Sequence, residues 1–335
     1  MATEQGRINL QLNTQSAIDI MLEPVFVDGL ITDSFALVKN LYAGEYKIGL
    51  LEAMKNVSGK AQACSPKYKG IAAMSERVLT ANYAEAGVVF CYEEFERTQY
   101  DWLAPFQSTS NGMQNATQLI SLLTRLLGDA IRRDVERVAW FGDSASINEN
   151  LNFADGVFKY LSQIITTGEI GYRVNSTQGT LLTNEQAYDL LFNVIDNAKP
   201  ELKQIPRAER VIHINGILWD KIIQHLRESS INNGFIKVFE DPMNENVATV
   251  NGIKVLAHYN WDSISEEYFG LVNQNKIIYT TKSNLVMGTD LRPDALGGKS
   301  FFKAYQDPKN DEITLSSKYI LAVNYVFASL FSVAL

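Results

Sequence analysis

Cysteine and histidine are scarce in this sequence. Its 335 residues include two cysteines, Cys64 and Cys91, and three histidines. Two cysteines so far apart imply neither a disulfide framework nor a metal knuckle, so we expect the chain to fold in a reducing, intracellular environment. The histidines His213, His225 and His258 show no spacing that is typical of metal ligands. We therefore predict neither a metal site nor a cofactor.

A signal peptide and a membrane span are also missing. The N-terminal stretch MATEQGRINLQLNTQS lacks the basic and then apolar order of a signal peptide, so we expect no export. The longest uncharged run, from Tyr319 to Leu335, falls short of a membrane span and contains Asn324. Because its side chains alternate as they do along a sheet, we interpret the run as buried strand structure and expect no membrane partner.

Positive charge is in the minority in this chain. There are 30 Lys and Arg residues against 38 Asp and Glu residues, which gives a net charge of -8. A dedicated surface for nucleic acid or for an anionic membrane is therefore not expected, and any contact with a polyanion should be local and weak. Hydrophobic residues make up 46% of the chain, enough for the core of one large or two smaller domains.

Recognisable catalytic motifs are absent as well. Residues 56–61, NVSGKA, share Gly-Lys with a phosphate-binding loop, but the leading glycine, the following Ser or Thr and the helix are lacking. We interpret this segment as a hairpin tip. His213 is a possible catalytic base, but no paired nucleophile accompanies it, and a histidine within a core strand is the favoured interpretation.

Two groups of carboxylates are candidates for a catalytic pair of the glycosidase type. A glycosidase needs two carboxylates that face each other across the substrate, whereas neighbours on a strand point to opposite faces. Solvated charges or salt bridges between subunits are the favoured interpretation. The groups are Glu93 with Glu94, and Asp262 with Glu266 and Glu267.

The N-terminal part indicates an extended arm followed by a long hairpin. Residues 1–45 show no sustained helical period, and residues 46–95 suggest one strand going out and one coming back. An isolated two-stranded ribbon is marginal in water, so it needs a surface to lie on. The basic tip either complements an acidic neighbouring surface or keeps an edge hairpin soluble. Its lysines are Lys55, Lys60, Lys67 and Lys69.

One very long amphipathic helix is predicted next, over about residues 112–141. Asn111 and Gln114 form a plausible capping box at its start, and Ser108, Thr109 and Ser110 are alternative caps. At 1.5 Å per residue such a helix is about 45 Å long, and Gly142 is expected to end it in the left-handed conformation. Apolar residues recur every three or four positions and form one stripe, whereas charged residues fill the other faces. The stripe contains Leu119, Leu122, Leu123, Leu126, Leu127, Ala130, Ile131, Val135 and Val138, and the charged residues include Arg125, Arg132, Arg133, Glu136 and Arg137.

The second half predicts alternating strands and helices. Thr183 and Gln186 form a capping box for a helix that Pro200 bounds. The strand RVIHIN and the helix GILWDKIIQHLRE follow, with Ile217 among the inward residues. Asn251-Gly252 between two β-rich runs is the strongest hairpin signal, and residues 301–331 suggest two or three further strands with a turn at residues 307–311.

The order of these elements resembles the major capsid proteins of tailed bacteriophages, which have the Hong Kong 97 fold. The stretches DVERVAWFGDSASINENLNFADGVF and VNGIKVLAHYNWD carry the resemblance most clearly. It implies an α+β subunit made of five parts. These are an N-terminal arm (1–45), an E-loop hairpin with its return strand (46–95), a P-domain (96–180) that contains the spine helix, an A-domain (181–290), and a closing β region of the P-domain (291–335).

The resemblance also implies a structural function without catalysis. The chain would assemble into hexamers and pentamers of an icosahedral shell around double-stranded DNA, in the host cytoplasm, and then reside in the virion capsid. Its partners would be further copies of itself, scaffolding, portal and decoration proteins, and DNA held by weak, non-specific contacts. Residues expected to serve assembly are Lys55, Lys60, Lys67, Lys69, Arg125, Arg132, Arg133, Glu136 and Gly142.

Two alternatives remain open at the level of sequence. An encapsulin-type nanocompartment would use the same fold to enclose a cargo enzyme, and gene neighbourhood would distinguish the two. A soluble α/β enzyme with an unrecognised site is the second alternative. Size in solution separates it from a shell protein, because an enzyme should elute as a small oligomer.

Overall fold

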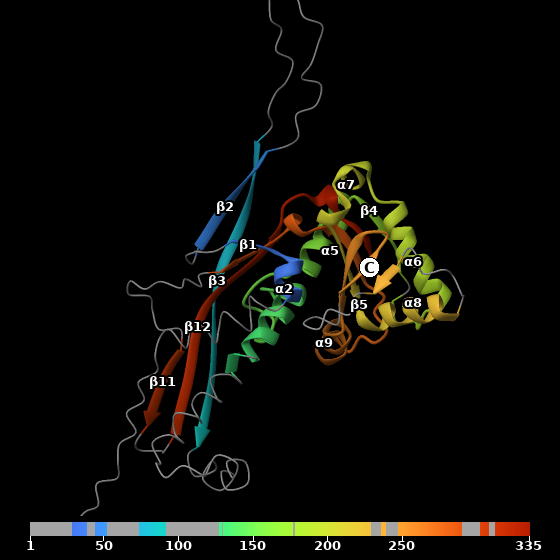
Figure 1. The fold of residues 1–335 in the computed structure, drawn as a ribbon. Coiled ribbons are helices and arrows are strands. Elements are labelled where there is room, and N and C mark those ends of the chain that lie inside the picture. The colour runs from blue at the N-terminus through green and yellow to red at the C-terminus, as the bar shows by residue number, and fades with distance from the viewer. Residues whose placement is uncertain are drawn as a thin grey trace, which may run out of the picture.

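The computed structural model describes residues 29–38, 44–51, 74–91, 127–128, 130–176, 178–228, 236–238, 247–289, 302–307 and 312–335. The basic hairpin tip and the first half of the predicted long helix lie outside these residues. The described part of the chain forms two β-sheets with helices beside and between them (Figure 1).

The first sheet has six strands and is dominated by two long ones. Its order is β1-β10-β12-β3-β2, and β11 also pairs with β12. The β12–β3 ladder is antiparallel and runs from Glu312 opposite Cys91 to Leu321 opposite Asn82. The strands are β1 (Ala36–Val38), β2 (Gly44–Leu51), β3 (Met74–Cys91), β10 (Leu285–Thr289), β11 (Phe302–Asp307) and β12 (Glu312–Tyr325).

The second sheet has seven shorter strands in the order β4-β13-β9-β5-β8-β7-β6. Its two central strands, β5 and β8, are parallel, and α8 follows β5 directly. The strands are β4 (Tyr172–Val174), β5 (Arg210–Asn215), β6 (Ile236–Val238), β7 (Val247–Val250), β8 (Ile253–His258), β9 (Ile277–Thr281) and β13 (Ser332–Ala334). The helices of this part are α6 (Asn184–Asp196), α7 (Pro200–Gln204), α8 (Gly216–Glu228) and α9 (Asn260–Phe269), with short 3-10 turns η3 (Arg207–Glu209), η4 (Lys282–Asn284) and η5 (Ala328–Leu330).

The chain passes between the two sheets more than once. Strand β10 lies within the range predicted for the A-domain but pairs in the six-stranded sheet, through β12 and β1. Strand β13 lies in the range predicted as the closing region of the P-domain but pairs with β9 and β4 in the seven-stranded sheet. Each of these two strands therefore belongs to the other sheet than the predicted ranges 181–290 and 291–335 would suggest.

A helical layer lies between the sheets. It contains the helical residues 130–141, which are the end of the predicted long helix, together with α2 (Gly29–Ser34) and α5 (Val157–Thr167). Figure 1 shows this layer between the long strands and the seven-stranded part. The largest apolar cluster includes Ile131 from the helix, Leu161 from α5 and Leu321 from β12, all buried. This layer is the packing contact that joins the two sheets.

Several local predictions are confirmed. Thr183 and Gln186 form a reciprocal capping box at the start of α6. Asn251 and Gly252 have φ values of 53° and 78°, the left-handed pair that a tight two-residue hairpin turn requires, and they join β7 to β8. Strands β2 and β3 pair from Gly44 opposite Ala81 to Leu51 opposite Met74, as expected for a hairpin.

Three expectations about local structure and burial were wrong, besides those for Gly142 and Glu136 that are described with the site. Residues 29–34 form the short helix α2 within the predicted extended arm; one and a half turns are too short to show a helical period, and tertiary contacts of Ile31 and Phe35 hold them. Ala130 is exposed although its spacing fits the buried stripe. Ile217 is 41% exposed at the first turn of α8, where the neighbouring Trp219 is buried instead.

Candidate functional site

Close packing of two glycines ends the helix of residues 130–141. The helix closes with a hydrogen bond from Gly142 N to Val138 O of 2.9 Å, and Gly156 N then donates to Gly142 O at 2.8 Å. A Cβ on Gly142 would lie 2.6 Å from Val138 O and still closer to Ala154 O, and one on Gly156 would lie 2.6 Å from Gly142 N. Gly142 does not take a positive φ, so the left-handed stop was a wrong prediction. Glycine is needed because the returning chain crosses the helix end in direct backbone contact.

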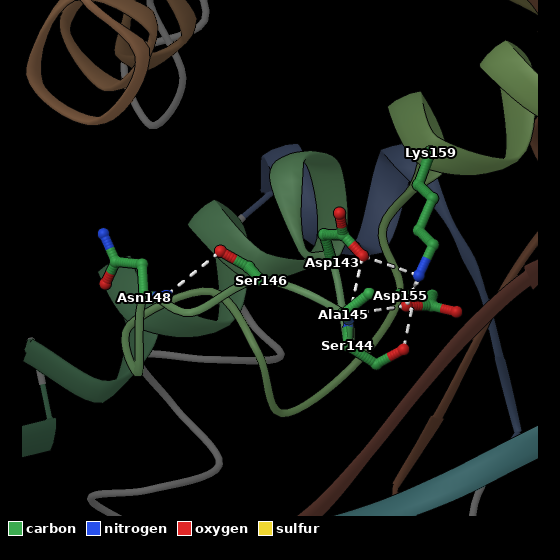
Figure 2. A network of polar contacts seen from close by, with 7 residues as sticks. All are labelled: Asp143, Ser144, Ala145, Ser146, Asn148, Asp155 and Lys159. Atoms are coloured by element: carbon green, nitrogen blue, oxygen red, sulfur yellow. Dashed lines mark hydrogen bonds and ion pairs between the residues drawn. The ribbon is translucent and has the colours of Figure 1, made fainter.

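A lysine clamps the loop between the two glycines. Figure 2 shows Lys159, from the first turn of α5, reaching Asp143 and Asp155, the residues that follow and precede the two glycines. Its Nζ lies 2.6 Å from Asp143 Oδ1 and 2.7 Å from Asp155 Oδ1. The same two oxygens accept hydrogen bonds from Ala145 N and Ser144 N, of 2.9 and 2.7 Å. Each carboxylate therefore binds both the lysine and a backbone N–H of the loop.

Consecutive polar turns fix the rest of this loop. Ser146 Oγ accepts from Asn148 N at 3.1 Å, and Asn148 Oδ1 accepts from Asn150 N at 3.0 Å (Figure 2 shows the first contact). Arg137 Nε, on the helix, donates to Asn150 O at 3.3 Å. Ile147 stands at the apex of these turns with its side chain 99% exposed. The loop is thus a fixed structure that presents one apolar side chain to the outside.

The electrostatics of the clamp favour its charged state. The hydrogen bond from Lys159 is the main cause that lowers the pKa of Asp143. Burial raises the pKa of Asp155, but its hydrogen bonds with Lys159 and Ser144 outweigh burial and lower the pKa overall. Burial opposes the charge of Lys159, yet the two carboxylates raise its pKa. All three groups are therefore charged at neutral pH.

A second polar cluster lies beneath the same helix end and is buried. His213 Nδ1, on β5, is 3.1 Å from His258 Nε2, on β8. Trp140 lies 5.0 Å from both imidazoles, measured between ring centroids, and Trp261 stacks on His258 at 4.4 Å. Glu136 Oε1 is 3.8 Å from His258 Nδ1. The helix thus contacts the seven-stranded sheet through an aromatic and imidazole cluster.

The carboxylates that sequence analysis weighed as a catalytic pair do not form one. Asp262 accepts a hydrogen bond of 3.0 Å from Asn215 and one of 3.3 Å from Ile217 N, at the start of α8, and burial raises its pKa. Glu266 and Glu267 are exposed. Asp262 therefore has a structural role, while Glu93 and Glu94 lie outside the described residues.

Nearby, Lys276 is a second half-buried cation that the sequence did not indicate. Its Nζ lies 4.7 Å from the Phe141 ring and 4.6 Å from the Phe158 ring, and donates to Ser265 Oγ at 3.2 Å. Burial lowers the pKa of Lys276 to about 8. This lysine packs against the side chain that ends the helix, so it supports the same junction.

The structure places the predicted assembly residues in different environments. Arg133 is exposed and Arg132 is half-buried on the helix. Glu136 is buried and accepts a hydrogen bond of 3.0 Å from Asn260, so it faces the inside of the subunit, contrary to prediction. Gly142 is buried in the crossing described above. The others lie outside the described residues: Lys55, Lys60, Lys67, Lys69 and Arg125.

The part of the chain that the structure describes holds neither a metal-ligand cluster nor a membrane-spanning helix. No group of three or more His, Cys, Asp or Glu side chains in this part of the chain has the arrangement of a metal site. No helix within the described ranges has the length and apolar character to cross a membrane.

Comparison with solved structures identifies the fold. A chain of the satellite phage P4 procapsid, solved with the size determination protein, matches with a TM-score of 0.54 over 96% of this chain and 98% of that one, at 10% identity. A chain of the capsid of Myoviridae phage XM1 matches with a TM-score of 0.51 over 92% of each chain, at 8% identity. A virus-like particle from Pyrococcus furiosus matches at 0.47 over 96% and 98%, at 10% identity. No protein-family model and no curated protein matches the sequence.

The chain therefore has the fold of phage capsid proteins. It is the α+β fold of the Hong Kong 97 type, and the predicted resemblance is confirmed at this level.

Proposed function

We propose that this chain is the major capsid protein of a phage, whose copies assemble into hexamers and pentamers of an icosahedral shell around double-stranded DNA. One observation carries the proposal: the match to two phage capsid chains extends over more than nine-tenths of this chain and of each of theirs, so the likeness is to a whole subunit and not to one part of it. Assembly in the host cytoplasm and residence in the virion follow from this role.

Exposed apolar side chains support a protein that is completed by its neighbours. Strand β3 buries Ala84 against the core but leaves Tyr83 63% and Val89 58% exposed on its other face. Ile147, at the apex of the clamped loop, is almost fully exposed. Large apolar side chains in such positions are typical of surfaces that contact another protein. Contacts between identical copies around closed symmetry would cover them.

Two segments are proposed to reach neighbouring subunits. The hairpin over residues 46–95 would lie across one neighbour and the arm over residues 1–45 beneath another. Scaffolding, portal and decoration proteins would be further partners of the shell. With a net charge of -8, contact with the packaged DNA would be weak and non-specific.

Electron microscopy and size-exclusion chromatography of the purified chain test the proposal. We expect capsomers or closed particles of megadalton mass, with nuclease-protected DNA in particles recovered from infected cells. Particles that contain a protein cargo in place of DNA would favour a nanocompartment shell. A small, stable oligomer at high concentration would contradict a shell role and favour the enzyme alternative.

A hairpin deletion tests the proposed contact between neighbours. Because Leu51 and Met74 lie directly opposite each other, a two-residue Asn-Gly turn can replace residues 52–73 and leave the β2–β3 register intact. We expect a folded subunit that does not close shells. Its thermal unfolding, compared with that of the parent chain, is the control for folding. Normal particles from this variant would refute the role assigned to the hairpin.

A further inference from the structure

Two buried imidazoles meet where the helix of residues 130–141 rests on the seven-stranded sheet. His213 and His258 lie on the parallel neighbours β5 and β8, and their exposed fractions are 0% and 1%. Trp140 from the helix contacts both rings, and Trp261 from α9 stacks on His258 with an interplanar angle of 4°. The pair is therefore enclosed by aromatic rings and shielded from solvent.

The contact has room for one proton. Two imidazole nitrogens 3.1 Å apart form a hydrogen bond only when one donates and the other accepts. The remaining ring nitrogens, His213 Nε2 and His258 Nδ1, are buried without a hydrogen-bond partner within the described residues. Protonating both rings would place two hydrogens in the contact and two charges side by side in a desolvated site. The packed geometry therefore requires that at least one ring stay neutral.

Few charges face the pair. Glu136 from the helix is the nearest carboxylate, 3.8 Å from His258 Nδ1, and its other oxygen is occupied by Asn260 from α9. The other charged groups around this core are engaged elsewhere. Asp262 of α9 binds Asn215 of β5, Lys276 before β9 binds Ser265 and two phenylalanine rings, and Asp33 of α2 pairs with Lys254 of β8.

We propose that His213 and His258 form a proton-sensitive joint, which holds the helix end on the seven-stranded sheet when the pair is uncharged and releases it when the pair takes up protons. The release site is the contact of Trp140 with the two rings. Opening at this point would let water reach the imidazoles and solvate their charge.

The direction of the pH dependence follows from burial. Burial lowers the pKa of His213 well below its ordinary value, and the neighbouring His258 adds to that effect. Burial also lowers the pKa of His258, although Glu136 opposes the shift. Since both folded pKa values lie below the unfolded value of about 6.5, the closed state is fully favoured above that pH and loses stability as pH falls below it. Each neutral histidine that is protonated on opening changes the closed-to-open ratio by about tenfold per pH unit, so the pair changes it by up to about a hundredfold.

In a shell the joint would act on the shape of the subunit, a consequence that rests on the proposed function. The helix contacts both sheets, so a looser helix end would allow the sheets to change their relative angle. The joint itself is a property of the single chain and is tested without reference to particles.

Hydrogen exchange of the full-length protein between pH 7.5 and 5 tests the joint. After correction for intrinsic exchange rates, opening of residues 130–141 should increase below pH 6.5 by up to about a hundredfold per pH unit. His258→Gln leaves one titrating ring and should reduce the dependence to about tenfold per unit. His225→Gln, on α8 and outside the pair, is the matched control and should behave as the parent chain does.

A second variant keeps the test valid if His258→Gln does not fold. Glu136→Gln retains both rings and removes the carboxylate that favours the charged form of His258, so the steep dependence should extend to lower pH. Opening that does not change between pH 7.5 and 5 would refute the joint, and so would equal slopes for the parent and the folded variants. A chain that never forms particles would refute the shell function but would leave this measurement intact.

Discussion

Substitution of Gly142 by alanine tests the account of the helix end. The new Cβ would lie 2.6 Å from Val138 O and closer still to Ala154 O, where ordinary contacts are about 3.4 Å or more. Two of the three nearest atoms are backbone oxygens, so the returning chain has to move by roughly 1 Å. Such a shift would also disturb the 2.8 Å hydrogen bond from Gly156 N to Gly142 O. We expect a loss of about 3 kcal/mol in unfolding free energy, the upper end of the range for overpacking.

Gly49→Ala is the matched control for this substitution. Gly49 lies in β2 without a positive φ, and a Cβ there would meet no atom within 4 Å. Alanine should therefore be neutral or slightly stabilising in a strand. Denaturant unfolding of both variants, followed by far-ultraviolet circular dichroism, measures the difference. If Gly142→Ala stays within about 0.5 kcal/mol of Gly49→Ala, the crossing can relax and our explanation of the glycine is wrong.

Two further substitutions test the polar contacts. Lys159→Gln should cost about 1–2 kcal/mol at pH 7, because it leaves Asp143 and Asp155 as adjacent unpaired carboxylates; the estimate is reduced because Asp143 is 45% exposed. In the parent chain the pKa values of both carboxyl groups are lowered, so the ionised carboxylates stabilise the fold above about pH 4. This contribution is lost as the pH falls through their pKa values. Acid unfolding of the variant should therefore be less steep than that of the parent. Asn284→Ala should cost about 1–3 kcal/mol in denaturant unfolding, because it leaves the half-buried Phe327 N without its acceptor and removes one of the two hydrogen bonds that Phe327 O accepts. Asn284→Asp should recover part of the loss by restoring the acceptor. No change for Asn284→Ala would show that water replaces the amide.

Sequence reasoning succeeded where a few adjacent residues determine the structure. The capping box of Thr183 and Gln186 and the turn at Asn251-Gly252 are local, since the groups that interact are at most three residues apart. The arrangement of these elements also pointed to the fold that the structural comparison identified. Local signals were sufficient because each of these elements is consistent with its tertiary environment.

The candidate site was less predictable because distant residues form it. His213 and His258 are 45 positions apart and come together only through the parallel pairing of β5 and β8. Because Glu136 is charged, it was predicted to lie on an outer face of the helix. In the structure it is buried, with Asn260 as a hydrogen-bond donor and His258 close by. Gly142 was correctly predicted to end the helix, but the reason lies in a chain segment that returns 12 residues later. The spacing of apolar residues predicts a helix, but it does not predict which other segment of the chain packs against its end.

The two sheets are also joined where the chain passes from one to the other. The chain leaves the seven-stranded sheet for the six-stranded one after β9 and returns after β12, and Asn284 lies at the first passage while Phe327 lies at the second. The buried Asn284 side chain donates to Phe327 O at 3.1 Å and accepts from Phe327 N at 2.7 Å. The backbone carbonyl of Asn284 accepts from Val326 N at 2.9 Å. These bonds fix the two passages to each other and do not titrate. If the subunit opens at the proposed histidine joint, the hydrogen bonds of Asn284 would still hold the two sheets together at these passages.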